Sequence, residues 1–299
     1  MRSVLGVFLC VVLGCAKPIT IAYQDRIGDG VMLVAVAKGF FEAQGLHVNP
    51  KRFASGPTTS EALLFGDADF ATMGDTAALI ALGKYCPRVQ ALMPLGGGEE
   101  RHWVVVPKTS LATGLEELQG KRVAVKFGTS THGGLLLKTQ SLGLSLDKEM
   151  MDLAPSLMAT ALASGEVDAV VASEPTPSVL VERGVGKRLM SLGGTGNTYP
   201  LLLMAKERSL KEHAKALPAL KEALAQSAAF IAAFPEETAQ ILSAATGLSL
   251  EATTQAMAYH FYRVGWEEAD LKSLEALGEF LVAQGTLGRV RPLGECVAP

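Results

Sequence analysis

Residues 62–75 read ALLFGDADFATMGD, and residues 161–174 repeat the pattern as ALASGEVDAVVASE. Each copy has the end of a helix, then Gly-acid-x-Asp, then a short apolar run, then a carboxylate. Glycine suits a helix end because a positive φ costs it little, and the apolar run predicts a short buried strand. Asp75 and Glu174 then follow strand C-terminal ends, where open α/β sheets bind ligands. A single copy would fit any α/β protein, but two copies in matching register predict two lobes that face one cleft.

Strands alternate with helices along the chain, which predicts an α/β fold with a mainly parallel sheet flanked by helices in each lobe. The pattern restarts near residue 108 and returns near residue 195. We therefore expect residues 15–107 and 195–299 to form a discontinuous lobe I, and residues 108–194 to form lobe II. Crossing segments near 104–109 and 192–200 would act as a hinge that closes around a ligand. Residues 31–44 are expected to form one helix.

The N-terminus has the layout of a secretory signal peptide. Arg2 precedes a mostly apolar stretch over residues 4–13 that is too short to span a bilayer. The following residues 12–15, VLGC, resemble a bacterial lipobox, which predicts a signal peptide over residues 1–14 and lipidation of Cys15. The alternative is an ordinary signal peptide cleaved nearby, with Cys15 incidental. In the first case the protein meets the membrane only through its lipid anchor.

Charge and cysteine content limit the partners and the compartment. The chain has 27 basic and 30 acidic residues, a formal net charge of −3, which argues against a nucleic-acid partner. Beyond the lipobox, Cys86 and Cys296 remain as a pair suited to an oxidising envelope. The sequence leaves open whether they form a disulfide or stay as free thiols.

Residues 128–134, GTSTHGG, are the sharpest local candidate for a binding site. A helix that starts here would offer free backbone N–H groups and its positive dipole end to an anion. Hydroxyl and imidazole donors stand beside it, namely Thr129, Ser130, Thr131 and His132. The alternative is that one hydroxyl simply caps the helix. The stretch lacks the Lys-Ser/Thr of a P-loop, so nucleotide hydrolysis is not expected.

Two further helix entries offer similar groups. Ser55 and Gly56 precede one expected helix, and Asp75 and Thr76 begin another. Asp75 either caps its helix or contacts the ligand. Glu174 is followed by a proline and is a candidate to accept a hydrogen bond from a ligand or to pair with a hinge cation.

No catalytic or metal-binding constellation stands out. The chain has no Gly-x-Ser-x-Gly and no His-Glu-x-x-His, and its five histidines are scattered. We therefore expect neither catalytic residues, nor a metal, nor a cofactor. Arg26, at the end of the first expected strand, is a candidate to neutralise an anion.

These passages together resemble a known family. Residues 38–46 (KGFFEAQGL), residues 118–125 (LQGKRVAV), the loop at residues 128–130 and both copies of the repeat match its pattern. The chain resembles, over about residues 18–235, the solute-binding lipoproteins of ABC importers for nitrate, alkanesulfonates, taurine and thiamine-precursor pyrimidines.

The resemblance implies a two-lobed periplasmic-binding-protein type II fold. It also implies that the protein is not an enzyme. Such a protein sits at the extracytoplasmic face of the cell envelope, captures a small and here anionic solute such as a sulfonate, nitrate or carboxylate, and delivers it to a membrane permease with its ATPase. The implied ligand-binding residues are Ser55, Gly56, Asp75, Thr76, Thr129, Ser130, Thr131, His132 and Glu174. The alternatives are a pyrimidine-precursor binding protein, a related enzyme similar to thiamine-pyrimidine synthases, and an envelope sensor.

Overall fold

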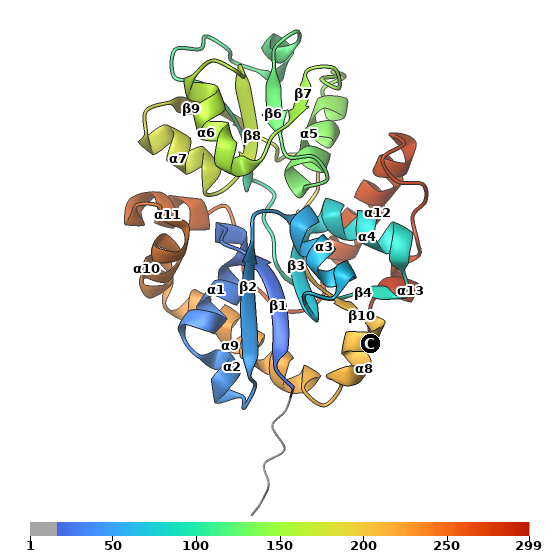
Figure 1. The fold of residues 1–299 in the computed structure, drawn as a ribbon. Helices are drawn as coiled ribbons and strands as arrows, with labels where there is room; N and C mark the ends of the chain where they lie inside the picture. The colour runs from blue at the N-terminus through green and yellow to red at the C-terminus, as the bar shows by residue number, and fades with distance from the viewer. Residues whose placement is uncertain (1–16, 299) are drawn as a thin grey trace, which may run out of the picture.

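The structure is a computed structural model that describes residues 17–298, and it consists of two lobes stacked one above the other (Figure 1). Lobe I is built on a sheet whose strand order is β2-β1-β3-β10-β4. The strands of this sheet are β1 (Ile19–Gln24), β2 (Val48–Phe53), β3 (Phe70–Gly74), β4 (Val89–Gly96) and β10 (Leu201–Lys206). Strands β1, β2 and β3 pair in parallel, and β10 runs antiparallel to both β3 and β4.

Lobe II repeats this plan with the order β7-β6-β8-β5-β9. Its strands are β5 (His102–Pro107), β6 (Val123–Val125), β7 (Met150–Asp152), β8 (Ala169–Ser173) and β9 (Gly186–Ser191). Here β5 is the reversed strand, antiparallel to β8 and β9. Each sheet therefore has four strands in one direction and one against them, which confirms the expected mainly parallel α/β fold.

Helices cover both faces of each sheet. Lobe II carries η2 (Leu115–Leu118), α5 (Ser130–Ser141), α6 (Pro155–Ala163) and α7 (Thr176–Glu182). Lobe I carries η1 (Ile27–Asp29), α1 (Gly30–Ala37), α2 (Phe40–Ala43), α3 (Gly56–Phe65), α4 (Asp75–Tyr85), α8 (Glu207–Glu212), α9 (Leu217–Ala233), α10 (Pro235–Thr246), α11 (Leu250–Met257), α12 (Glu268–Ala283) and α13 (Leu293–Cys296). Buried aliphatic side chains fill the layers between sheets and helices, with separate apolar clusters on the two faces of each sheet.

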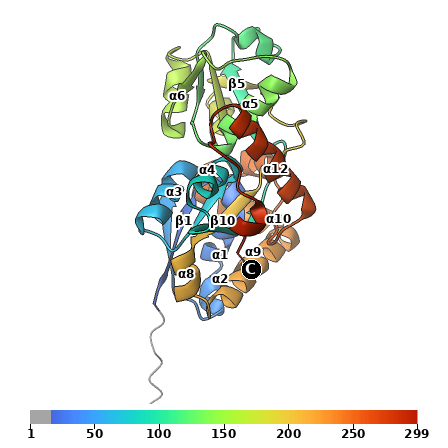
Figure 2. The ribbon, with the colours of Figure 1, turned by 90° about the vertical axis from the view of Figure 1, so that its right-hand side faces the viewer.

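The boundary between the lobes differs from the predicted one at one crossing. Strand β5 pairs with β8 and β9, so residues 102–107 belong to the sheet of lobe II, although they were expected in lobe I. The first crossing is therefore residues 97–101 and not 104–109. The second crossing is residues 192–200, between β9 and β10. Figure 2 shows the two lobes from the side. The error arose because an apolar strand carries no local mark of which sheet it joins.

The predicted helix over residues 31–44 is in fact two helices. Helix α1 ends at Ala37, and α2 begins at Phe40. Between them Gly39 has a φ of +68°, a left-handed conformation that glycine adopts without a Cβ clash. This turn redirects the chain before β2.

The repeated motif ends a helix and connects two neighbouring strands in both lobes. Gly66 follows α3 with a φ of +93°, and Gly165 follows α6 with a φ of +72°. Asp69 Oδ2 then accepts a hydrogen bond of 2.9 Å from the backbone N–H of Thr20, near the start of β1. Asp168 Oδ2 accepts an equal bond from the N–H of Arg122, next to β6. In each lobe the aspartate thus ties the start of one strand to its neighbour, away from the cleft.

Cys86 and Cys296 form a disulfide, with their Cα atoms 5.6 Å apart. It ties the end of α4 to the last helix, α13, and so resolves the alternative that the sequence left open. Among residues 17–298, no helix is both long and apolar enough to cross a membrane. The predicted signal peptide and Cys15 lie outside the described residues.

Candidate functional site

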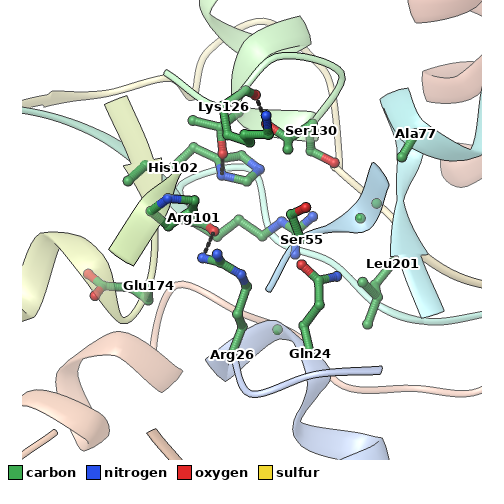
Figure 3. Close-up of a pocket in the computed structure, with 18 of the residues that line it drawn as sticks. Gln24, Arg26, Ser55, Ala77, Arg101, His102, Lys126, Ser130, Glu174 and Leu201 are labelled. Carbon is green, nitrogen blue, oxygen red and sulfur yellow. Dashed lines mark hydrogen bonds between the residues drawn. The ribbon is translucent and has the colours of Figure 1, made fainter. Parts of the chain in front are cut away.

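A small cavity of about 50 Å³ lies between the two lobes (Figure 3). Its walls come from the C-terminal ends of β1, β3 and β8, from the starts of α3 and α5, and from the first crossing segment. This is the edge of the sheets where α/β proteins bind ligands. The volume corresponds to a few water molecules, so it fits a small ligand or one head group. The polar lining comprises Gln24, Arg26, Asp29, Ser55, Arg101, His102, Lys126, Thr129, Ser130, Thr131, Ser173 and Glu174.

Arg101, the last residue of the first crossing, is the most unusual group of this cavity. Only 5% of it is exposed, and its Nε has no hydrogen-bond partner among the described residues. The arginine ion pairs found among residues 17–298 all involve other arginines, namely Arg52, Arg122, Arg188, Arg208 and Arg263. Burial lowers the pKa of Arg101, and the charges of Asp75 and Asp29 oppose that shift from a distance. A buried cation without an ion-pair partner is costly, and a bound anion would remove that cost.

Two glycines leave the space that the side chains of Arg101 and Ser130 occupy. A Cβ on Gly28 would lie 2.7 Å from Arg101 Nη1. A Cβ on Gly74 would lie 1.9 Å from Ser130 Oγ, which no side chain could tolerate without movement. The middle of η1 and the end of β3 therefore approach the cavity closely because they carry no side chain there.

Arg26 adds a second positive charge and joins the two lobes. Its Nη2 donates to the carbonyl oxygen of Ala54 (3.0 Å), and its Nη1 donates to Ser173 Oγ (3.2 Å) at the end of β8. Figure 3 shows its side chain reaching from the start of η1 towards Arg101. Burial lowers the pKa of Arg26, and the charges of Asp29 and Asp25 act against this shift.

Neutral donors complete one wall of the cavity. Ser130 Oγ and His102 Nε2 are both buried and have no hydrogen-bond partner among the described residues. His102 Nδ1 lies 3.1 Å from Thr131 Oγ1, so one ring nitrogen is engaged and the other is free. Burial and the charge of Arg101 hold the pKa of His102 well below its usual value, so the ring is neutral. With a proton on Nε2, it donates one hydrogen bond without adding charge.

Asp29 is a buried carboxylate of the cavity whose pKa is raised. It is 1% exposed and accepts hydrogen bonds from Thr72 Oγ1 (2.5 Å) and from the N–H of Gln24 (3.3 Å). Burial raises its pKa to about 6, while these hydrogen bonds and the charges of Arg26 and Arg101 work in the other direction.

The two carboxylates predicted to face the ligand are engaged in other bonds. Asp75 is fully buried and accepts from Asn197 Nδ2 (3.0 Å) and from the N–H of Thr76 (2.6 Å). It therefore ties the start of α4 to the second crossing. The carboxylate of Glu174 pairs with Arg188 at 2.6 Å and accepts from the N–H of Ser178 at 3.1 Å.

The cavity brings together six of the nine predicted ligand residues: Ser55, Gly56, Thr129, Ser130, Thr131 and Glu174. Asp75, Thr76 and His132 do not line it. Thr129 also caps α5, because its Oγ1 accepts from the N–H of His132 (3.4 Å), as the capping alternative expected. The ring of His132 stacks on Phe127 instead of facing the cavity.

Arg101, His102, Gln24 and Asp29 line the cavity but were not predicted as ligand residues from the sequence. One available signal was the run of three glycines, residues 96–98, directly before the charged residues 99–101. A Cβ on Gly98 would lie 2.1 Å from the carbonyl oxygen of Tyr259. Such tight packing marks a segment enclosed by the fold, and Arg101, which follows it, is buried.

Comparison with known proteins agrees with this architecture. The NMT1-like family model matches residues 16–246. The chain belongs to the NMT1-like family. A binding protein of Brucella abortus (strain 2308) is 26% identical over 232 residues, which cover 75% of this chain and 70% of that protein. The taurine-binding periplasmic protein of Escherichia coli K12 is 28% identical over 172 residues, 56% of this chain and 52% of that protein.

Solved structures share the fold of this NMT1-like protein at low sequence identity. The alkanesulfonate-binding protein SsuA of Xanthomonas axonopodis pv. citri, bound to MOPS, has a TM-score of 0.85 at 22% identity, covering 94% of this chain and 98% of that one. The nitrate-binding protein NrtA of Synechocystis PCC 6803 has a TM-score of 0.74 at 17% identity, covering 91% and 82%. These relatives are solute-binding proteins and not enzymes, and the predicted family and fold are confirmed.

Proposed function

We propose that this NMT1-like protein captures a small organic anion, of the sulfonate class, between its lobes and delivers it to the permease of an ABC importer. The observation that carries the proposal is Arg101, a buried cation that forms no ion pair within residues 17–298. Arg26 stands beside it, and Ser130 and His102 offer unused donors. A ligand that only accepts hydrogen bonds and carries negative charge would satisfy all four groups together.

The donor set favours a sulfonate over the other ligand classes considered. A sulfonate is fully ionised, has three acceptor oxygens and no proton to donate. A neutral pyrimidine precursor would leave the charge of Arg101 without compensation. The relatives are binding proteins, which favours capture over the enzyme alternative.

The shape of the cleft favours an organic anion over nitrate alone. A wider chamber of about 500 Å³ begins at Arg26 and Pro155, which line both spaces. Residues of both lobes form it, among them Phe53 and Val179. The inner cavity would hold the charged head group, and the outer chamber would hold the substituent. Closure of the lobes around the ligand would use the two crossing segments as the hinge.

The anchor and the partners complete the proposal. A lipid on Cys15 would keep the protein at the outer face of the membrane, next to a permease that works with its own ATPase. Intact-mass measurement of the protein from the membrane fraction tests the lipid anchor, since a lipidated chain is heavier than the same chain without lipid. Cys15→Ala should release the protein from membranes, and continued attachment would contradict the assignment.

The binding proposal is tested by calorimetry and thermal shift with alkanesulfonates, taurine, nitrate and a neutral pyrimidine. We expect a sulfonate to raise the melting temperature, because a ligand that binds only the folded state stabilises it. Arg101→Gln should weaken binding by roughly tenfold to a hundredfold, the value of one or two charged hydrogen bonds. Arg289→Gln, on the exposed surface, is the matched control and should bind as the wild type does. If no anion of the panel binds, or if Arg101→Gln binds equally well, the proposal is wrong.

A further inference from the structure

Three side chains with metal-binding atoms meet in lobe I, at the edge of its sheet that faces away from the cleft. Asp69 directly precedes β3, and Glu212 and His213 end α8, which lies near the start of β1 in Figure 1. One ligand atom from each residue lies within 4.8 Å of the others. The sequence separates Asp69 from the other two by more than a hundred residues, so only the fold shows the cluster.

His213 is the member of this cluster that needs an explanation. It is 6% exposed, and its Nε2 is buried without a hydrogen-bond partner among residues 17–298. The atom it faces is Asp69 Oδ1, at 3.5 Å. Asp69 Oδ2 is already used by the N–H of Thr20, which fixes the carboxylate and leaves Oδ1 directed at the imidazole. The two atoms are near each other and yet form no hydrogen bond.

Their spacing is the one that a shared metal ion requires. Zinc binds histidine nitrogen and carboxylate oxygen at about 2.0–2.2 Å, and two ligands at a tetrahedral angle then stand about 3.4 Å apart. We propose that Asp69, Glu212 and His213 bind one divalent transition-metal ion of the zinc type, with water completing its coordination. Three protein ligands and one open position form a known kind of zinc site.

The carboxylate of Glu212 is oriented by its contacts with two basic side chains. Its Oε1 accepts from Arg208 Nε at 2.5 Å, and its Oε2 accepts from Lys17 Nζ at 3.1 Å. Each carboxylate oxygen has a second lone pair, so the side chain can turn one towards a metal ion and keep both contacts. Such outer contacts orient a metal-binding carboxylate. They also place two exposed positive charges nearby, so we expect an affinity in the micromolar range.

The ligand set selects among metal ions. One imidazole and two carboxylates suit Zn²⁺ and its transition-metal neighbours, whereas Mg²⁺ and Ca²⁺ prefer sites made entirely of oxygen. The competing explanation is a plain ion pair between protonated His213 and Asp69, which needs no metal. The two explanations differ in whether the protein takes up Zn²⁺.

The test is a calorimetric titration of the tag-free, metal-stripped protein with ZnCl₂, alongside thermal shift and the visible absorption of a Co²⁺-loaded sample. We expect one Zn²⁺ per chain, a higher melting temperature, and Co²⁺ bands typical of nitrogen and oxygen ligands. His213→Gln and Asp69→Asn should each lower the affinity at least tenfold. Glu212→Gln, at a partly exposed position, tests the same site with little risk to the fold.

Asp168→Asn is the matched control, because Asp168 occupies the same place in the second copy of the repeat and has no histidine beside it. Its Zn²⁺ affinity should equal that of the wild type. Circular dichroism of each metal-free variant checks that it is folded. The proposal is overturned if the wild type takes up no Zn²⁺, or if His213→Gln and Glu212→Gln bind it as tightly as the wild type. The result is independent of the anion site, which lies at the other end of the sheet.

Discussion

Replacing Arg101 with glutamine should make the unliganded protein more stable while it weakens anion binding. The side chain is 5% exposed, its Nε has no hydrogen-bond partner within the described residues, and burial lowers its pKa. When folding lowers the pKa of a base, the charged form of that base destabilises the folded state relative to the unfolded state. This cost is present at every pH at which arginine is charged, so removal of the charge recovers it.

The size of the effect follows from the same environment. Burial of an unpaired polar or charged group costs about 1–3 kcal/mol or more, and the charges of Asp75 and Asp29 offset part of this cost. We therefore expect Arg101→Gln to raise the free energy of unfolding by about 1–3 kcal/mol, which corresponds to a melting temperature about 2–6 °C higher. With saturating sulfonate the wild type should gain about 1.4–2.7 kcal/mol more than the variant, because its affinity is tenfold to a hundredfold higher, so the difference in stability should shrink or reverse.

Urea denaturation and differential scanning calorimetry, each with and without ligand, measure both effects. Arg101→Lys is the informative companion, since it keeps the charge and loses the planar fork. It should resemble the wild type in stability without ligand and lie between the wild type and Arg101→Gln in affinity. A fall in the stability of unliganded Arg101→Gln, together with unchanged anion affinity, would show that Arg101 supports the fold and does not serve the ligand.

Three further predictions concern pH, the contact between the lobes and the disulfide. Because the pKa of Asp29 is raised to about 6, its proton stays bound in the folded state between about pH 4 and 6, so its contribution to stability falls as the pH rises through that window. Protonation of Asp29 also removes a negative charge beside the arginines. Anion affinity measured by calorimetry should therefore be severalfold higher at pH 5 than at pH 7.5. Asp29→Asn should abolish this pH dependence. Ser173→Ala removes the hydrogen bond from Arg26 across the cleft and should weaken binding by about 0.5–1.5 kcal/mol, with a larger mean radius in X-ray scattering. Reduction of the Cys86–Cys296 disulfide, whose cysteines are 210 residues apart, should lower the free energy of unfolding by about 2–5 kcal/mol in urea denaturation, while anion affinity stays unchanged.

The fold was largely predictable because its signals are local. A glycine at a helix end, an acidic turn and an apolar run occur within fourteen residues, and both copies form the helix, turn and strand that they predict. The assignment of β5 to lobe I was wrong, because pairing with β8 and β9 is decided by contacts between distant segments. Local patterns identify a strand more readily than they identify its neighbours.

The candidate site was predictable only in part, for a related reason. The entries to α3 and α5 could be recognised from their hydroxyl and glycine residues, and they do line the cavity. The roles of Asp75 and Glu174 depend on partners that the sequence does not reveal. Asn197 reaches Asp75 from the second crossing, and Arg188 reaches Glu174 from β9. A carboxylate at the C-terminal end of a strand can therefore be engaged by side chains from distant segments of the fold.

The first crossing joins the proposed hinge to the proposed anion site within a few residues. Glu99 Oε1 accepts hydrogen bonds from three consecutive backbone N–H groups of the second crossing, those of Gly194 (2.9 Å), Thr195 (3.0 Å) and Gly196 (2.9 Å). Arg101 follows two residues later and enters the cavity. A rotation of the lobes that changed the first crossing would also move the guanidinium. An anion held by Arg101 would in turn favour the arrangement of the crossings that places this charge correctly, so recognition of the anion and closure of the lobes are coupled through one short segment.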